Sequence, residues 1–236
     1  MELPANPELA GVAGMIGHPA RAAMLSALLR GEAMTSGALA RCAGVAAATA
    51  SEHLARLVEH GLVTRRAAGR CRYYELAGAD VAAALEALAR VANKSKVEGR
   101  SFPEYERALR FARTCYDHLA GRVGVMLHDV LLERALIVPS ASDTTGEGDA
   151  WLTALGIDVD GLRRGRRAFL RPCLDWSERR DHVAGAVGAA ITAAMLERRW
   201  VVRMPDTRAV RLTLRGREGL YRVLGLEMQV WDRVGR

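Results

Sequence analysis

The chain has 236 residues, half of them hydrophobic, which is enough to bury one large core or two small ones. Its formal net charge is +7, and this basic excess suits a polyanionic partner without requiring one. No apolar run approaches the length of a membrane span, and we expect a cytoplasmic protein without a signal segment. The four cysteines are widely separated, so structural disulfides are not expected in a reducing compartment.

The first quarter of the chain predicts three helices followed by a hairpin. Residues 17–34 and 35–45 carry the patterns of two helices, the second ending in a tight turn at Gly44. A third helix follows in VAAATASEHLARLVEHGLV, residues 45–63, where Leu54 and Leu57 belong to a buried stripe and Gly61 supplies the C-cap. Residues 64–76, TRRAAGRCRYYEL, divide at Gly69 into two strand-forming runs, as in a hairpin.

This order of elements is that of a winged helix-turn-helix. The polar residues of the third helix lie off its buried stripe, and the hairpin carries four arginines against one glutamate, which suits phosphates or the minor groove. Ser51 is the better candidate for a phosphate contact, whereas a structural role for His53 is as good an explanation as a DNA contact. The candidate DNA-binding residues are Thr49, Ser51, Glu52, His53, Arg56, Arg65, Arg66, Arg70 and Arg72.

The same region resembles the ArsR/SmtB family of bacterial repressors over roughly the first 95 residues. The resemblance is carried by HPARAAMLSALL, by GALARCAGVAAATASEHLARLVEHGLV and by RRAAGRCRYYEL. It implies a sequence-specific transcriptional regulator, a repressor that binds double-stranded operator DNA. Ala46, Ala47 and Ala48 stand where the family commonly has Ser, Pro or Gln, so fewer side chains are available to bases and phosphates.

Residues 79–92, ADVAAALEALARVA, predict a helix with Val81, Leu85, Leu88 and Ala92 along one stripe. In the family that the chain resembles, this helix and the N-terminal one pair across a two-fold axis, which implies a homodimer; an ordinary intrachain core stripe is the alternative. The polar run NKSKVEGRS, residues 93–101, predicts a linker. We therefore expect a DNA-binding and dimerisation domain at residues 1–95 and a second domain at residues 104–236.

The second domain contains a duplication. RTCYD at 113–117 leads into HLAGRVG at 118–124, and RPCLD at 171–175 leads, after the insert WSERRD, into HVAGAVG at 182–188. Each copy continues through a helix to a wing-like segment, at 144–157 and at 212–226, so we expect winged-helix-like repeats at about 104–160 and 165–236. The small residues Ala120, Gly124, Ala184 and Gly188 predict a close helix pair. The expected fold class is α+β, mainly α with small β-hairpin wings.

Each copy also holds a cysteine, an aspartate and a histidine in the same order. We interpret each aspartate as a helix N-cap with the cysteine just before it, a position that shifts a thiol towards thiolate, the form that binds soft metals or reacts with electrophiles. Two cysteines and two histidines are also a ligand set that zinc accepts, so zinc or another thiophilic metal is the candidate cofactor. The candidate metal or effector residues are Cys115, Asp117, His118, Cys173, Asp175 and His182.

Less specific roles for these residues stay open. Capping alone explains the aspartates, a buried cysteine is commonly a small hydrophobic residue, and an organic ligand is an alternative effector. The insert WSERRD lengthens the second Cys-to-His interval, so the two copies are expected to differ in geometry. The metal ligands of the ArsR/SmtB family are missing from the first domain, where Thr35 and Gly37 replace a Cys-x-Cys pair. Any sensing is therefore expected in the repeats.

The alternative function is an enzyme, such as a methyltransferase-like protein, that uses the winged helix only for dimerisation. Such an enzyme requires alternating strands and helices with a Gly-rich turn, and the second half of the chain shows no such alternation. We therefore expect a transcriptional regulator and no enzyme.

Overall fold

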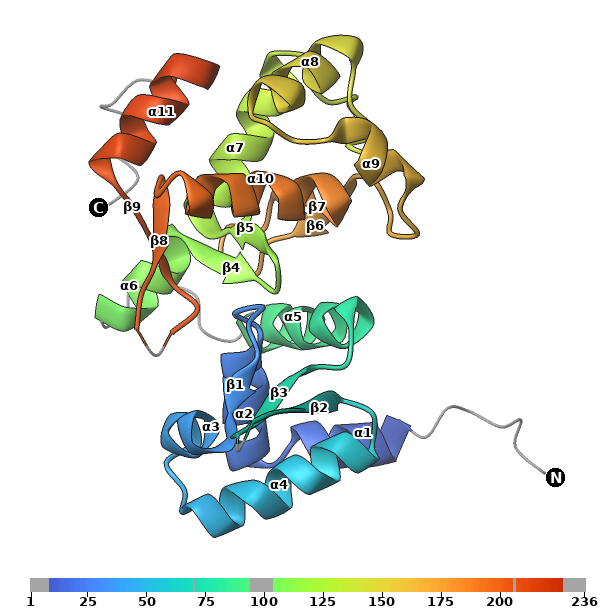
Figure 1. The fold of residues 1–236 in the computed structure, drawn as a ribbon, viewed down its shortest axis with the longest axis vertical. Coiled ribbons are helices and arrows are strands. Elements are labelled where there is room, and N and C mark those ends of the chain that lie inside the picture. Colours follow the sequence, from blue (N-terminus) through green and yellow to red (C-terminus); the bar gives the residue numbers. More distant parts are fainter. Residues whose placement is uncertain (1–8, 70, 94–103, 206, 227–236) are drawn as a thin grey trace, which may run out of the picture. The chain divides into compact units, whose positions relative to one another are not determined.

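The computed structural model describes residues 9–69, 71–93, 104–205 and 207–226 (Figure 1). Helices predominate beside small antiparallel sheets, and the predicted α+β class is confirmed. The chain divides into two compact units, Met1–Leu85 and Glu86–Arg236. The polar segment at which the sequence placed the domain boundary lies almost wholly outside the described residues. None of the helices in these ranges combines the length and apolar character needed to cross a membrane.

The first unit has the elements of a winged helix-turn-helix in the predicted order. Its helices are α1 (Leu9–Ile16), α2 (Pro19–Leu28), α3 (Ser36–Ala43), α4 (Ala47–Glu59) and the first part of α5 (Ala79–Asn93). The boundary between the units lies within α5, after Leu85. One antiparallel sheet has the strand order β1-β3-β2, with β1 (Met34–Thr35), β2 (Val63–Ala68) and β3 (Cys71–Leu76). Strands β2 and β3 form the predicted hairpin, called the wing below.

The helix-turn-helix follows from its local sequence and a shared core. Helix α3 starts at Thr35, whose hydroxyl accepts a hydrogen bond from the backbone N–H of Ala38. Gly44 ends α3 with a φ of 64°, a conformation that glycine adopts at little cost, and the chain turns into α4. Helix α4 buries Leu54 and Leu57 completely. Its other faces therefore stay at the surface.

The second unit contains six helices that begin within it and three hairpins among the described residues. Its helices are α6 (Glu104–Phe111), α7 (Gly121–Glu133), α8 (Gly146–Ala154), α9 (Val159–Arg164), α10 (Gly185–Glu197) and α11 (Leu214–Leu224). Its strands pair as hairpins: β4 (Arg113–Cys115) with β5 (His118–Ala120), β6 (Arg171–Leu174) with β7 (Asp181–Ala184), and β8 (Val201–Arg203) with β9 (Val210–Leu212).

In each of the two duplicated segments a hairpin runs directly into a long helix, β4-β5-α7 in one and β6-β7-α10 in the other. The segments expected to be wing-like are instead dominated by the helices α8 and α11. Each of these two helices is started by a threonine, Thr145 or Thr213, whose hydroxyl accepts a hydrogen bond from the backbone N–H of the glycine three residues later. This cap stabilises the start of a helix within a segment that was expected to be wing-like.

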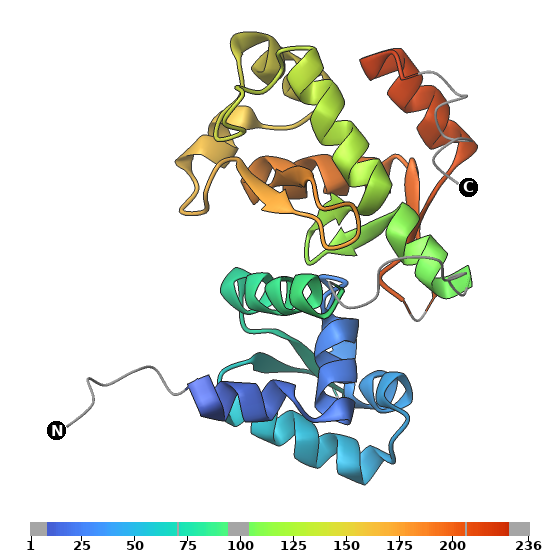
Figure 2. The same cartoon turned by 180° about the vertical axis from the view of Figure 1, so that it is seen from behind.

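The two repeats exchange contacts, because each hairpin packs against the long helix of the other repeat. Strand β5 packs against α10 and β7 against α7, and Figure 2 shows these elements together from behind. A Cβ added at Gly124 or Gly188 would overlap the carbonyl oxygen of the strand that leads into its own helix. The same two positions face the other repeat, at 3.6 Å from the Cβ of His182 and 3.3 Å from the Cβ of His118. The small residues therefore bring each helix mainly against a hairpin, and not against the other helix as the sequence indicated.

Gly188→Ala is expected to destabilise the second unit by about 1–3 kcal/mol, because the added methyl group meets backbone that has no room to move. Gly146→Ala is the matched control. Gly146 lies in the first turn of α8 with nothing within 4 Å of an added Cβ, so this change should leave stability unchanged or raise it slightly. All four tryptophans lie at position 151 or later, so urea unfolding followed by tryptophan fluorescence reports on this unit. Equal midpoints for the two variants would contradict the exchanged packing.

Candidate functional site

The surface of α4 carries most of the side chains expected to contact DNA. The exposed ones are Thr49, Ser51, Glu52 and Arg56. His53 is half-buried, and its ring centroid lies 4.5 Å from that of His18, the N-cap of α2. Burial, together with His18 and two nearby arginines, lowers the pKa of His53. The packing of the His53 ring against His18 of α2 favours a structural role for His53 over a DNA contact.

The alanines at the start of α4 leave the backbone of its first turn accessible. The N-cap Ala46 makes no side-chain hydrogen bond, and residues 46–49 are exposed. The hydroxyl of Ser51 donates to the carbonyl of Ala47 at 3.0 Å and so supports the helix itself. The first N–H groups of a helix attract anions when no side chain caps them. Backbone groups can therefore supply the phosphate contacts that the alanine side chains lack.

The wing presents arginines on both of its faces. Arg65 and Arg66 lie on β2 and Arg72 on β3, and all three are exposed. The strand register places Arg65 and Arg72 on one face, while Arg66 lies on the other with its guanidinium 5.2 Å from the ring centroid of Tyr73. Arg70, the fourth candidate, lies outside the described residues.

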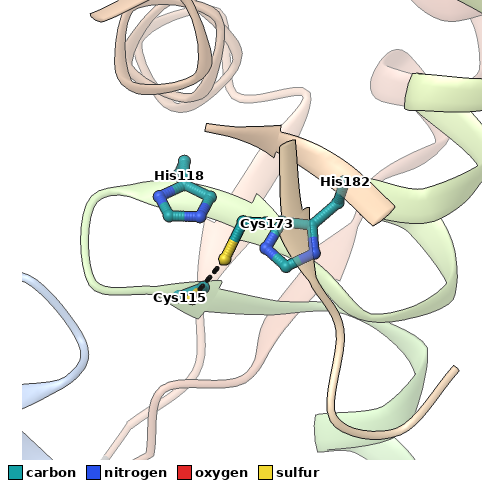
Figure 3. Close-up of side chains that lie close together, drawn as sticks. All are labelled: Cys115, His118, Cys173 and His182. Carbon is teal, nitrogen blue, oxygen red and sulfur yellow. Dashed lines mark hydrogen bonds between the residues drawn. The ribbon is translucent and has the colours of Figure 1, made fainter. Parts of the chain in front are cut away.

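In the second unit, two cysteines and two histidines come together where the hairpins β4-β5 and β6-β7 meet (Figure 3). Within each hairpin the cysteine lies directly opposite the histidine, Cys115 opposite His118 and Cys173 opposite His182. One sulfur or imidazole nitrogen from each residue lies within 4.8 Å of the others. These four residues are called the Cys-His cluster below. The two sulfur atoms are 4.0 Å apart and not bonded, since a disulfide requires about 2.05 Å.

The expectation that the two copies differ in geometry is wrong for this cluster. The insert WSERRD lengthens the turn of the second hairpin, but Cys173 and His182 still pair directly across the strands, as Cys115 and His118 do. Residues opposite each other in an antiparallel pair project to the same face whatever the length of the turn. Both hairpins therefore present their sulfur and imidazole side by side.

The expectation that the cysteines precede helix N-termini is also wrong. Cys115 ends strand β4, Asp117 lies in the tight turn after it, and α7 begins only at Gly121. The second copy follows the same plan, with β7 between Cys173 and the start of α10. Strands of three or four residues are too short to show an alternating pattern in the sequence. The ionisation of the thiols is therefore governed by the cluster and not by a helix dipole.

Cys115 and Cys173 differ in their tendency to ionise. The hydrogen bond to Cys173, together with burial, raises the pKa of the Cys115 thiol. The same hydrogen bond outweighs burial at the other sulfur and, with the two neighbouring imidazoles, lowers the pKa of Cys173 to about 2. Within the cluster, Cys173 therefore ionises more readily than Cys115.

Both imidazoles of the cluster are buried, with His118 only 3% and His182 only 1% exposed, and their ring centroids are 5.1 Å apart. Their Nε2 atoms are buried without a hydrogen-bond partner among the described residues. The other ring nitrogens face carboxylates: His118 Nδ1 lies 3.1 Å from Asp117, and His182 Nδ1 lies 3.6 Å from Asp175. The two predicted aspartates therefore stand behind the histidines and are not members of the cluster.

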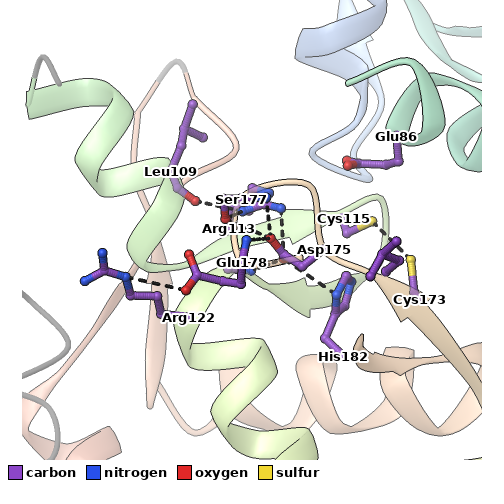
Figure 4. Close-up of polar contacts among 12 residues, drawn as sticks. Glu86, Leu109, Arg113, Cys115, Arg122, Cys173, Asp175, Ser177, Glu178 and His182 are labelled. Carbon is purple, nitrogen blue, oxygen red and sulfur yellow. Dashed lines mark hydrogen bonds and ion pairs between the residues drawn. The ribbon is translucent and has the colours of Figure 1, made fainter. Parts of the chain in front are cut away.

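Asp175 joins the two repeats through an ion pair with Arg113, whose side chain is fully buried, as is that of Asp175 (Figure 4). The guanidinium lies 2.9 Å from Asp175 Oδ2 and 4.4 Å from the ring centroid of Trp176. The same oxygen accepts the backbone N–H of Gly121 at 2.7 Å. Burial opposes ionisation of Asp175, but the charge of Arg113 holds its pKa well below the usual range. Asp175 therefore helps to start α7, the helix of the other repeat.

Sequence reasoning missed two arginines that hold the aspartates. Arg113 binds Asp175, and Arg167 donates to Asp117 at 3.0 Å. A signal for Arg113 was present, because an arginine precedes the cysteine by two residues in both RTC and RPC. No comparable spacing marks Arg167.

Arg113→Met is expected to destabilise the second unit by about 3–5 kcal/mol, because the Asp175 carboxylate stays buried without its counter-ion. Arg180→Met is the control, since Arg180 is 63% exposed in its pair with Asp129 and such pairs contribute at most about 1 kcal/mol. Urea unfolding followed by circular dichroism compares the two variants. A destabilisation by Arg113→Met no larger than that of the control would show that Asp175 does not depend on Arg113.

Comparisons with known proteins cover the helix-turn-helix of the first unit and, for one relative, nearly the whole chain. A family model described as a helix-turn-helix domain matches residues 16–66. The chain is 41% identical over 225 residues to an uncharacterized HTH-type transcriptional regulator, YdfF of Bacillus subtilis (strain 168), a match that covers 94% of this chain and 100% of the relative.

Two solved structures are similar to parts of the chain. NolR from Sinorhizobium fredii is 30% identical, with a TM-score of 0.34 and coverage of 38% of this chain and 96% of its own. The homodimeric winged helix-turn-helix DNA-binding domain of Mb0332 from Mycobacterium bovis, a possible ArsR-family transcriptional regulator, is 26% identical, with a TM-score of 0.36 and coverage of 43% and 100%.

Neither the family model nor the relative supports the alternative of an enzyme. The prediction of a helix-turn-helix transcriptional regulator is confirmed. The chain binds DNA to regulate transcription, and it belongs to the family of helix-turn-helix transcriptional regulators that includes YdfF.

Proposed function

We propose that this regulator represses transcription by binding operator DNA as a homodimer, and that its second unit responds to a thiophilic metal or a thiol-reactive compound. The observation that carries the DNA-binding part is the exposed polar face of α4 together with the exposed arginines of the wing. The observation that carries the sensing part is the Cys-His cluster.

Helix α4 enters the major groove in this proposal. Its buried residues Leu54 and Leu57 hold it to the core, which turns Thr49, Glu52 and Arg56 towards solvent. Arginine is suited to the acceptor edge of guanine, glutamate to the amino group of cytosine and threonine to a thymine methyl group. The accessible N–H groups of the first turn supply a phosphate contact that fixes the position of the helix on the duplex.

The wing contributes contacts to the DNA backbone or the minor groove. Arg65 and Arg72 share one face, so both guanidinium groups approach the same stretch of duplex. Contacts of this kind add affinity for any sequence and release counter-ions, which makes binding dependent on salt.

Replacing Arg65 and Arg72 together with alanine is expected to weaken binding to every DNA sequence. The slope of log affinity against log salt should become shallower by about one for each phosphate that the variant no longer neutralises. Arg215→Ala, an exposed arginine on α11, changes the net charge without touching the wing and is the control. Thr49→Val should instead alter discrimination between promoter and random DNA, by about 1–3 kcal/mol if Thr49 contacts a base.

Fluorescence anisotropy with DNA from the chain's own promoter, repeated at several salt concentrations, measures all three variants. An unchanged slope for the arginine variant would remove the wing from the interface. In vitro transcription from the same promoter tests the direction of regulation, and activation by the added protein would contradict a repressor.

The proposed dimer rests on apolar surface at α1 and α5. Helix α1 buries none of its residues and exposes Leu9 at 71%. The predicted stripe on α5 needs correction, because Leu85 is buried within the chain at 9% exposure. The apolar side chains that α5 exposes are Leu88 at 47% and Val91 at 64%. Large apolar side chains gathered on adjacent helical turns are typical of an association surface.

Replacing Leu88 and Val91 together with aspartate is expected to dissociate the dimer, because unpaired charges would have to be buried at its interface. Folding of the single chain should be spared, since both side chains are already exposed. Leu214→Asp is the matched control, an apolar residue of α11 that is 70% exposed. Light scattering gives the mass in solution, and operator affinity should fall together with it. A dimer that persists in the double variant would place the interface elsewhere.

The sensing part of the proposal uses the asymmetry between the two sulfurs of the cluster. The thiolate is the form that binds soft metals and attacks electrophiles, and the cluster lowers the pKa of Cys173, which is also only partly buried and so open to a small effector. Repression is relieved when the effector binds, provided that the two states of the regulator differ in their affinity for it.

A further inference from the structure

The four donor atoms of the Cys-His cluster come from both repeats, two from each, so neither repeat alone supplies the full set. Each hairpin contributes one sulfur and one imidazole nitrogen, and the strand register holds these two side by side. The exchange of contacts between the repeats then brings the two pairs together. Two cysteines and two histidines form a common ligand set for zinc.

The spacing of the donor atoms suits a single metal ion. A tetrahedral zinc ion with Zn–S of about 2.3 Å and Zn–N of about 2.0–2.1 Å holds its ligand atoms roughly 3.3–3.8 Å from one another. In the structure all four atoms lie within 4.8 Å of one another, and the two sulfurs are 4.0 Å apart. The ligand atoms therefore need to approach one another by no more than about 1.5 Å.

The surroundings of the imidazoles point to the same ligand. The Nε2 atoms of His118 and His182 are buried without a hydrogen-bond partner in the described part of the chain, a state that proteins avoid unless an ion or a water molecule is bound. Asp117 and Asp175 face the opposite nitrogens. At His118 the hydrogen bond from Nδ1 to Asp117 fixes the tautomer that leaves Nε2 unprotonated, which is the arrangement usual for histidines that bind a metal. His182 Nδ1 lies 3.6 Å from Asp175, too far for a hydrogen bond, so both ring nitrogens of His182 are without a hydrogen-bond partner among the described residues.

A disulfide or plain core packing would account for only part of this geometry. A disulfide between Cys115 and Cys173 uses the sulfurs and leaves both Nε2 atoms unpartnered. Plain core packing leaves two buried imidazoles beside a sulfur pair, with both Nε2 atoms unpartnered among the described residues. A metal ion uses all four donor atoms and the two aspartates.

We propose that Cys115, His118, Cys173 and His182 form a closed, four-coordinate site for one thiophilic divalent metal ion, with zinc as the reference ion. As an effector site it rests on the function proposed above. Both cysteines bind the ion as thiolates, any thiol protons are released to solvent, and the two negative charges balance the charge of the ion. Because each repeat gives two ligands, the ion joins hairpin β4-β5 to hairpin β6-β7.

Metal binding is tested first with the full chain, reduced and freed of metal by a chelator. Titration with Co²⁺ should give one equivalent per chain, with the strong visible absorption and thiolate charge-transfer band of tetrahedral sulfur coordination. Zn²⁺ should displace the cobalt and abolish both bands. This experiment needs no variant, so a wild-type chain that shows no tetrahedral thiolate spectrum overturns the proposal directly.

Variants then assign the ligands. Cys173→Ser should weaken Zn²⁺ affinity, measured by competition with a chromophoric chelator, by more than about 100-fold. Asp117→Asn removes the carboxylate behind His118 and should weaken it by about 10- to 100-fold. Cys71→Ser is the matched control, an exposed cysteine of the wing that should leave the affinity unchanged. An equal decrease in the control, or no decrease in Cys173→Ser, would overturn the assignment.

Operator affinity, measured in the same samples, separates this site from the proposed function. We expect Zn²⁺ to lower operator affinity by about 5- to 150-fold, and Cys173→Ser to abolish that response. Binding of the metal with no change in operator affinity would support the site and refute its role as an effector site. A response to an oxidant in a chain that binds no metal would overturn the site and leave the sensing function standing.

Discussion

The second unit depends on one packing constraint, the seating of each hairpin against the long helix of the other repeat. Gly124 and Gly188 allow it, because a side chain at either position would overlap backbone on one side and meet a histidine of the other repeat on the other. This contact aligns four side chains that are up to 67 residues apart in the chain, from Cys115 to His182. The duplication thus supplies two half-sites, each with one sulfur and one imidazole, and neither is complete alone.

The buried ion pair between Arg113 and Asp175 favours this packing of the two repeats over alternative packings. A buried pair adds little net stability compared with apolar residues of the same volume, but an unpaired charge left inside is very costly. Alternative packings that separate the two groups are therefore penalised. Because Asp175 also receives the N–H of Gly121 and faces His182, the same carboxylate places the start of α7 and one imidazole of the cluster. Asp175 therefore contributes both to the packing of the repeats and to the surroundings of the Cys-His cluster.

Predictions from the sequence were reliable for segments whose structure is determined by neighbouring residues. The turn at Gly44, the buried stripe of α4 and the wing divided at Gly69 all formed as expected, since capping, helical spacing and hairpin turns act within a few residues. The same rules failed at Cys115 and Asp117, where an aspartate before a helical pattern was interpreted as an N-cap. The strand β5 lies between them and α7, and its three residues are too few to reveal a period of two.

The sequence by itself determined the class of protein, the helix-turn-helix, the basic wing, the duplication and the identity of the four sulfur and imidazole groups. Only the tertiary structure decided that these four groups form a single cluster, that the two aspartates stand behind the histidines, and that Arg113 and Arg167 hold those aspartates. The physical reason is that spacing along a chain specifies which residues share one element. Which elements of two repeats meet is set by shape complementarity between backbones and by the cost of burying charge, and neither is visible in the order of the residues.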